Sequence, residues 1–179
     1  MKSTSVAAYR EVFRYLKREV PDLSVPAYMG DFDDGAREAI GFEFPEAQIF
    51  GCSFYFAKCL VRHVSNPAVG LASDIRKRGE LLDTFLSFTA LPHLPPGEMA
   101  SVFSKLSEEA ICLDQRFCSL YDYINNWMQT IGPTGLSVFR APCRSTYSIE
   151  SNSAMILRDV GKVRGPVWDL IGESLQGFL

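Results

Sequence analysis

The chain has 179 residues, a length that fits one domain of ordinary size. Hydrophobic residues make up 47% of it and charged residues 22%, so it can bury a core and is not a disordered tail. A formal net charge of −3 argues against a uniformly basic nucleic-acid-binding protein but permits a local basic patch. No apolar run approaches a membrane span and the N-terminus lacks a signal-peptide core, so we expect neither a transmembrane nor a secreted protein.

The N-terminal part predicts a helix followed by a short buried strand. Apolar side chains recur there at helical spacing until Pro21: Val6, Tyr9, Phe13, Leu16 and Val20. Residues 23–29 are then apolar and short enough for a buried strand, which Pro26 weakens.

Residues 27–63 are the most informative stretch, because they predict a strand, a carboxylate, a helix, a second strand and a second helix. Asp31 ends the first strand, the first helix covers residues 33–43, and a second apolar run covers residues 47–56. The second helix is predicted over residues 57–64. A carboxylate just past a strand end lies where an open α/β sheet binds its ligands.

Three acidic residues crowd the start of the first of these helices. We interpret Asp33 and Asp34 as acids that cap the helix and match its dipole. For Asp31, residue type and position leave two roles open, a helix cap and a metal ligand. Cys52 and Tyr55 are interpreted as core residues, and His63 as a surface or capping histidine.

The middle of the chain predicts a packed layer of helices. Apolar stripes with steps of three or four run through residues 81–88, 99–113 and 117–127. The charged run at residues 74–79 is interpreted as a solvated helix face, and residues 132–135 as the opening of a loop. Five cysteines form no CxxC pair, so we expect reduced thiols and no zinc site.

The C-terminal part predicts a helix through residues 149–167 and a local basic patch. Residues 140–164 hold five basic side chains, Arg140, Arg144, Arg158, Lys162 and Arg164, against two acidic ones, a local charge of +3. Such a patch suits phosphate contact, although solvated charge on an exposed helix is the commoner explanation. Residues 167–179 are amphipathic and either complete the core or meet a partner.

The order of these segments resembles the Mutator-like (MULE) transposase domain, a DDE-type family with an RNase H-like fold. The resemblance rests on Gly30-Asp31-Phe32-Asp33, on Phe44-Pro45-Glu46-Ala47, and on Gly51-Cys52-Ser53-Phe54-Tyr55-Phe56. Tyr55 stands where the family commonly has His, which counts against a metal or proton-transfer role at the Cys52 and Tyr55 positions. Residues 88–92 and 123–127 fit the family's helical insertion, and residues 144–153 fit its closing motif.

The resemblance implies a mostly helical α/β chain. Residues 1–66 would form a truncated RNase H-like core, residues 67–131 an all-helical insertion, and residues 132–179 the closing core helices. Asp31 and Glu150 would then be the second and third catalytic acids and ligands of Mg²⁺ or Mn²⁺. The basic residues listed above would contact double-stranded DNA, and the location would be nuclear or cytoplasmic.

The family's first acid has no counterpart upstream of Asp31, so we expect no independent nuclease or transposase activity. The missing strands would also leave a sheet edge open to self-association. Two alternatives stay open. One is a domesticated DNA-binding or transcription-regulatory protein, and the other is a helical protein–protein interaction module.

Overall fold

The protein is a mostly helical α/β fold, seen in a computed structural model that describes residues 5–77 and 79–146. Two short strands, β1 (Ala27–Gly30) and β2 (Gln48–Gly51), pair in parallel, with Tyr28 opposite Ile49. Parallel neighbours need a crossover connection, which α2 (Asp34–Glu43) supplies. Within the described residues the sheet has these two strands only.

The strand–helix–strand order is the predicted one, but both strands are shorter than expected. Asp33 caps α2 by accepting a hydrogen bond from the Ala36 N–H at 2.8 Å, so its predicted role is confirmed. The predicted strand over residues 23–29 forms only from Ala27 onward, after Pro26, a residue that cannot donate to a strand ladder. The run at residues 47–56 forms a strand only to Gly51, because a helix begins two residues later.

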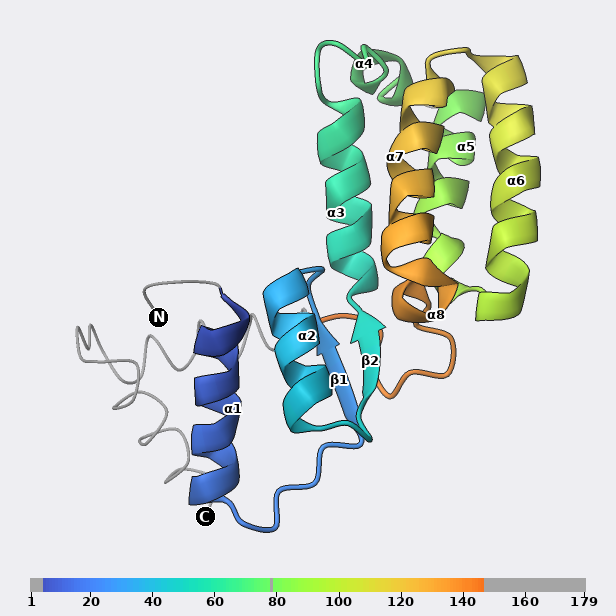
Figure 1. Cartoon of the computed structure of the whole chain (residues 1–179). Coiled ribbons are helices and arrows are strands. Elements are labelled where there is room, and N and C mark those ends of the chain that lie inside the picture. Colours follow the sequence, from blue (N-terminus) through green and yellow to red (C-terminus); the bar gives the residue numbers. More distant parts are fainter. Residues whose placement is uncertain (1–4, 78, 147–179) are drawn as a thin grey trace.

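The N-terminal helix α1 (Val6–Glu19) lies against α2 (Figure 1). Its apolar stripe is half-buried, and Phe13 meets Phe44 edge-on with ring centroids 6.1 Å apart. The docking also uses charge. Glu43, whose side chain is 9% exposed, accepts hydrogen bonds from Arg10 Nε at 2.7 Å and Arg14 Nε at 3.1 Å.

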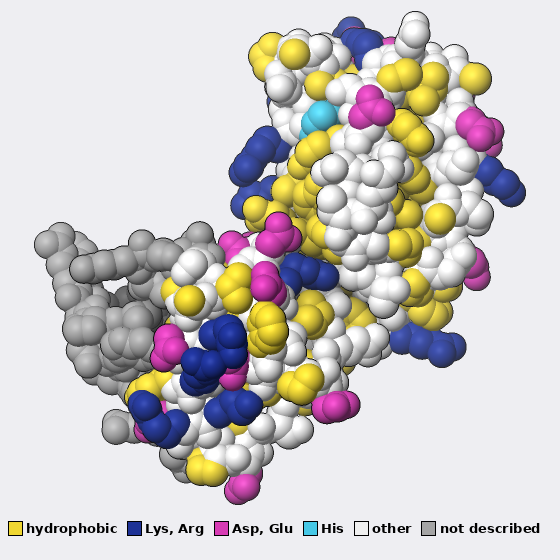
Figure 2. Space-filling model, viewed as in Figure 1, with side chains coloured by type: hydrophobic (Ala, Val, Ile, Leu, Met, Phe, Trp, Pro, Cys, Tyr) yellow, Lys and Arg dark blue, Asp and Glu magenta, His cyan; other side chains and the backbone are white. Residues whose placement is uncertain are grey.

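Figure 2 shows Lys and Arg side chains gathered over α1 and α2, with acidic side chains among them. Lys17 belongs to this group and donates from Nζ to the Glu43 carbonyl at 2.7 Å. Arg18 pairs with Glu19 at 3.3 Å. Because several of these cations pair with acids of α1 and α2, we interpret the group as a docking contact between the two helices.

Four longer helices form a bundle above the sheet (Figure 1): α3 (Ser53–Val64), α5 (Glu80–Thr89), α6 (Pro96–Leu113) and α7 (Phe117–Thr130). Three short helices connect or follow them: α4 (Ala72–Ile75), the 3₁₀ helix η1 (Leu91–His93) and α8 (Gly132–Leu136). The bundle encloses the main apolar core, which includes Phe56, Leu60, Phe88, Phe117, Leu120 and Ile124. The predicted core role of the three apolar stripes is thereby confirmed for most of their residues, whereas Leu86, Val102 and Leu113 are exposed.

Several local predictions are corrected by the structure. The helix expected from residue 57 begins at Ser53, because the Cys52 sulfur accepts a hydrogen bond from the Tyr55 N–H at 3.4 Å and caps it. Residues 132–136 form α8 instead of opening a loop, with Pro133 in the first turn, where a missing N–H costs nothing.

The charged run at residues 74–79 is only partly helical. Asp74 is bound there by Arg116 Nη2 at 2.9 Å, so one side of the run contacts protein and not solvent alone. His63 is not a surface or capping residue. It is half-buried between α3 and α7, stacked on Tyr123 and hydrogen-bonded to the Ser119 hydroxyl at 3.0 Å. In the described part of the chain, no helix is both long and apolar enough to cross a membrane.

Candidate functional site

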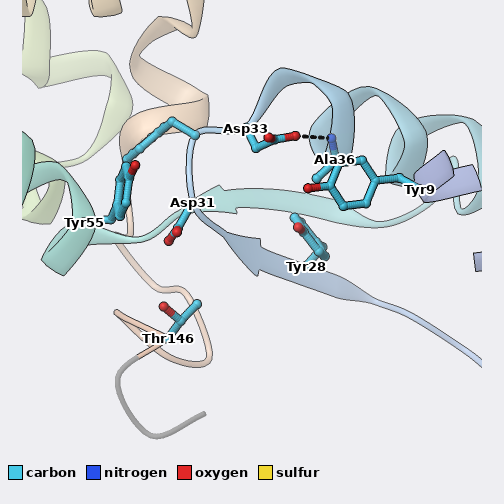
Figure 3. Close-up of a pocket in the computed structure, with 8 residues that line it drawn as sticks. Tyr9, Tyr28, Asp31, Asp33, Ala36, Tyr55 and Thr146 are labelled. Carbon is cyan, nitrogen blue, oxygen red and sulfur yellow. Dashed lines mark hydrogen bonds between the residues drawn. The ribbon is translucent and has the colours of Figure 1, made fainter. Parts of the chain in front are cut away.

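A cleft of about 590 Å³ lies at the carboxyl end of the sheet, next to Asp31. Asp31 follows β1 directly and is exposed. The cleft walls come from α1, β1, α2, α3 and a late loop, through Tyr9, Tyr28, Asp31, Phe32, Asp33, Ala36, Tyr55 and Thr146. In Figure 3 the Asp31 carboxylate points toward the side where Tyr55 and Thr146 lie, and Tyr28 lies on its other side. The predicted position of Asp31, just past a strand end, is confirmed.

The tyrosine hydroxyls of the cleft are held in their protonated form. The pKa of Tyr55 is raised by its interaction with the Cys59 sulfur, by burial and by Asp31. The pKa of Tyr28 is raised first by burial and then by Tyr9, with Asp31 and Asp33 acting in the same direction. Neutral hydroxyls can donate to a carboxylate or to a ligand oxygen at any physiological pH.

An aromatic contact fixes the turn that follows Asp31. The Phe32 ring lies 4.5 Å from the Trp127 ring of α7 and 6.2 Å from Tyr55, measured between centroids. Gly51 leaves room for this ring, because a Cβ at that position would lie 2.2 Å from Phe32 Cε1. The sheet end and the helical bundle are therefore locked together beside the cleft.

A late segment, residues 137–146, returns from the bundle to the cleft, and we name it the strap. The first end of the strap is bound to η1 and to Leu94, which follows η1. The Val138 N–H donates to the Pro92 carbonyl at 2.7 Å, and the Ser137 hydroxyl donates to the Leu94 carbonyl at 2.7 Å. Its second end is fastened to the start of α3. There the Arg144 carbonyl accepts from the Ser53 N–H at 3.1 Å and the Ser53 hydroxyl at 2.6 Å.

The Cys52 sulfur completes the second fastening. It accepts hydrogen bonds from the Thr146 N–H at 3.4 Å and the Thr146 hydroxyl at 3.5 Å. Cys52 is fully buried, as its core interpretation requires, whereas Tyr55 is half-buried at the cleft wall. Tyr55 therefore faces the same space as Asp31.

The basic residues of the predicted DNA-binding patch fall into two groups. Arg140 and Arg144 are exposed and line one hollow of about 400 Å³ together with His93, Val138 and Phe139. Arg140 has a left-handed backbone, φ 60°, and its guanidinium lies 5.2 Å from the centre of the Phe139 ring. Glu150, Arg158, Lys162 and Arg164 lie outside the described residues, as does the helix predicted over residues 149–167.

Sequence reasoning missed three residues of the cleft. Tyr9 belongs to the predicted apolar stripe of α1, and nothing in its spacing indicates that it lines the cleft. Tyr28 belongs to the predicted strand, and Thr146 to the predicted closing motif. The position of Thr146 four residues before Glu150 was the one signal that could have suggested a place near Asp31.

The donors around the cleft fit a divalent cation such as Mg²⁺ or Mn²⁺ in chemical kind. Carboxylates and hydroxyls are hard oxygen ligands, which Mg²⁺ prefers. They are too few for a complete site, because Asp33 already caps α2. In residues 5–77 and 79–146, no three His, Cys, Asp or Glu side chains are grouped so that they could hold a metal ion.

Comparisons with known proteins give no match: no protein-family model, no curated protein and no solved structure is similar to this chain at a significant level.

Proposed function

We propose that this chain is the part of a Mutator-like, DDE-type transposase domain that carries the second and third acids, Asp31 and Glu150. In this proposal β1, α2 and β2 belong to an RNase H-like core, and the helical bundle is the insertion between the two acids. The chain is related to DNA transposition, and we expect it to be inactive as a nuclease by itself.

One observation carries the proposal: Asp31 and Thr146, which precede and follow the helical bundle in the sequence, line the same cleft. A carboxylate at the end of a parallel strand is a common ligand position in α/β sheets. The strap brings the chain back to this position four residues before Glu150. The motif order therefore agrees with the observed proximity of the segments that lead to the two acids.

The chemistry of the family explains why we expect no independent cleavage. Divalent ions clamp the attacking and leaving oxygens of a phosphodiester when a set of carboxylates holds them. The matched motifs supply two acids, Asp31 and Glu150. Two carboxylates hold Mg²⁺ weakly, because this ion requires near-octahedral geometry and loses its water reluctantly. The described residues hold Asp31 at the end of β1 and line the space beside it with the hydroxyls of tyrosines and Thr146.

A plasmid-nicking assay tests the absence of cleavage. The purified chain is incubated with supercoiled DNA and Mg²⁺ or Mn²⁺, next to an Asp31→Ala variant. Asp34→Ala is the matched control, since Asp34 is an exposed acid in the first turn of α2. We expect background nicking from all three proteins. Nicking by the parent chain that disappears in D31A but persists in D34A would overturn the proposal of an inactive chain.

A second candidate, a DNA-binding protein derived from such a domain, is favoured by the shared hollow of Arg140 and Arg144. Duplex-DNA affinity is measured over a range of salt concentrations for the parent chain, for the Arg140→Gln and Arg144→Gln double variant, and for Arg18→Gln on α1. Each lost phosphate contact is expected to reduce the slope of log affinity against log salt by about 1. Absence of binding at low salt, or equal slopes for all three proteins, would remove this candidate.

A further inference from the structure

The hollow between η1 and the strap carries positive charge that no acid of the described residues offsets. Arg140 and Arg144 are exposed and line it together with His93, and we name it the arginine hollow. No Asp or Glu of the described residues lines it, and neither arginine forms an ion pair with one of them. Guanidinium groups without a carboxylate partner suit an oxyanion such as phosphate, because their fixed fork of donors matches its oxygens.

The backbone beneath both arginines is fixed in place. The Ala141 N–H donates to the Val138 carbonyl at 3.1 Å and closes a turn around Arg140. Arg140 is left-handed there, with φ 60°, a conformation that favours glycine over residues with a side chain. Local strain of this kind is found at ligand sites. The Arg144 carbonyl accepts from the Ser53 hydroxyl at 2.6 Å. A ligand therefore finds the two arginines partly preorganised, which reduces the entropy that binding costs.

His93 supplies a third side chain whose charge depends on pH. It belongs to η1 and lines the arginine hollow. Partial burial of its ring, and then the positive charge of Arg144, lower the pKa of His93. Among the described residues, Arg144 is the one charged group that contributes to this shift, and none on α5 or α6, which pack against η1, does so. A phosphate in the hollow would bring a negative charge beside both side chains and raise this pKa.

We propose that the arginine hollow is a phosphate site in which Arg140 and Arg144 hold the oxyanion and His93, once protonated, donates a third hydrogen bond to it. The inference deepens the second candidate function and rests on it where the phosphate belongs to a DNA strand. A free phosphate offers the same chemistry, and the experiment distinguishes the two sources. Phosphate binding and protonation of His93 then support each other, so affinity rises as the pH falls.

The first measurement follows the imidazole C–H signals of the full chain by NMR over a range of pH. The chain has two histidines, and His93→Gln assigns their signals. The titration is run without ligand, with a DNA duplex and with inorganic phosphate. The ligand that fills the hollow is expected to raise the pKa of His93 by about one unit. His63, half-buried between α3 and α7, is the internal control and should not shift. Arg144→Gln should raise the pKa of His93 in the free protein and weaken its response to the ligand.

The second measurement is the affinity for duplex DNA by fluorescence anisotropy, from pH 8 to pH 5.5 at one low salt concentration. A pKa shift of about one unit corresponds to a roughly tenfold limit, so parent affinity is expected to rise about three- to tenfold. H93Q should show a flat profile, whereas His63→Gln is the matched control and should keep the rise. Arg140→Gly keeps the left-handed backbone and removes the guanidinium, so it should weaken binding at every pH, by about three- to tenfold.

The two measurements separate failure of the site from failure of the candidate function. DNA binding with an unshifted His93 and the same pH profile in H93Q keeps the DNA-binding candidate and overturns the inference. Absence of DNA binding at every pH removes that candidate, yet a His93 shift with inorganic phosphate would then establish the hollow as a site for a free phosphate. An unshifted His93 with both ligands, or parent affinity in R140G for the ligand that shifts His93, overturns the inference.

Discussion

Glu43 holds α1 on α2, and its replacement by Gln tests how much charge contributes to that docking. The variant keeps the shape of the side chain and removes the negative charge that faces Arg10 and Arg14. A hydrogen bond to a charged group contributes about 1.5–3 kcal/mol, and the Arg10 contact, one-third exposed on the arginine side, belongs in the lower half of that range. The Arg14 contact, with an arginine 51% exposed, adds about 0.2–1 kcal/mol.

The Gln amide oxygen can still accept a neutral hydrogen bond from Arg10, worth about 0.5–1.5 kcal/mol, so the expected loss is about 1–2 kcal/mol of docking free energy. Among the described elements α1 packs mainly on α2, so the loss will appear as local opening of α1. Hydrogen exchange measures it: amide protection in α1 is expected to fall by about 5- to 30-fold in E43Q. Glu11→Gln is the control, since Glu11 is 67% exposed and its pair with Arg14 contributes little.

The same contact predicts a pH dependence. The Arg10 hydrogen bond, reinforced by the charges of Arg14, Arg10 and Lys17, lowers the pKa of Glu43 despite its burial. A group with a depressed folded-state pKa stabilises the fold above its unfolded pKa, about 4.3 for Glu, and loses that contribution as the pH falls further. Protection of α1 should thus decline below about pH 4 in the parent chain and stay flat in E43Q. Equal protection in E43Q and E11Q at pH 7 would refute this account of the docking.

Two further predictions concern the bundle and its contact with the sheet. Burial between α3 and α7 lowers the pKa of His63, so stability should fall as the pH drops through about 6.5 and level off below the folded pKa. Urea titrations from pH 5 to 8 should show a weaker pH dependence of stability in His63→Gln. The dependence that remains is due to His93, whose pKa is also lowered by burial. An unchanged pH profile would show that His63 does not cause the dependence. Gly51→Ala should cost about 1–3 kcal/mol in the same titrations, because its Cβ overlaps the packed Phe32 ring. Full stability in G51A would show that the ring moves freely.

The sequence was sufficient to predict the strand–helix–strand unit and the helices of the bundle. Asp33 is a common capping residue placed three positions before Ala36, so the start of α2 was visible in the sequence. The apolar stripes of α5, α6 and α7 were equally visible, because their side chains recur at helical spacing and are buried together. Asp31 was placed correctly for the same local reason, as the residue after a short apolar run.

Features that depend on unusual local chemistry were missed. The cap of α3 is a cysteine sulfur, and Cys52 is not among the residues that normally signal a helix start, so the helix was expected four residues too late. Gly132, with φ 76°, and Pro133 indicate a turn in sequence, yet the proline opens α8. His63 carries no pattern that reveals its partners, because Ser119 and Tyr123 lie on a helix distant in the sequence.

The strap could not be predicted, because its contacts join residues from distant parts of the chain. The hydrogen bond from Ser53 to the Arg144 carbonyl spans 91 positions and leaves no local signal. Only part of the candidate site was therefore predicted. The sequence indicates that Asp31 belongs to the site, whereas the position of Thr146 in the cleft is seen only in the structure.

The contact between Ser53 and Arg144 also means that the whole block of residues between them starts and finishes at one point in space. Segments whose ends meet in this way can be gained, lost or exchanged as a cassette without changing the path of the host chain. A tight turn joining Cys52 directly to Ser145 would remove every helix from α3 to α8, and leave the two strands connected through α2. On the sheet side the change would remove the support that Trp127 gives to Phe32 and the packing of α8 against β2.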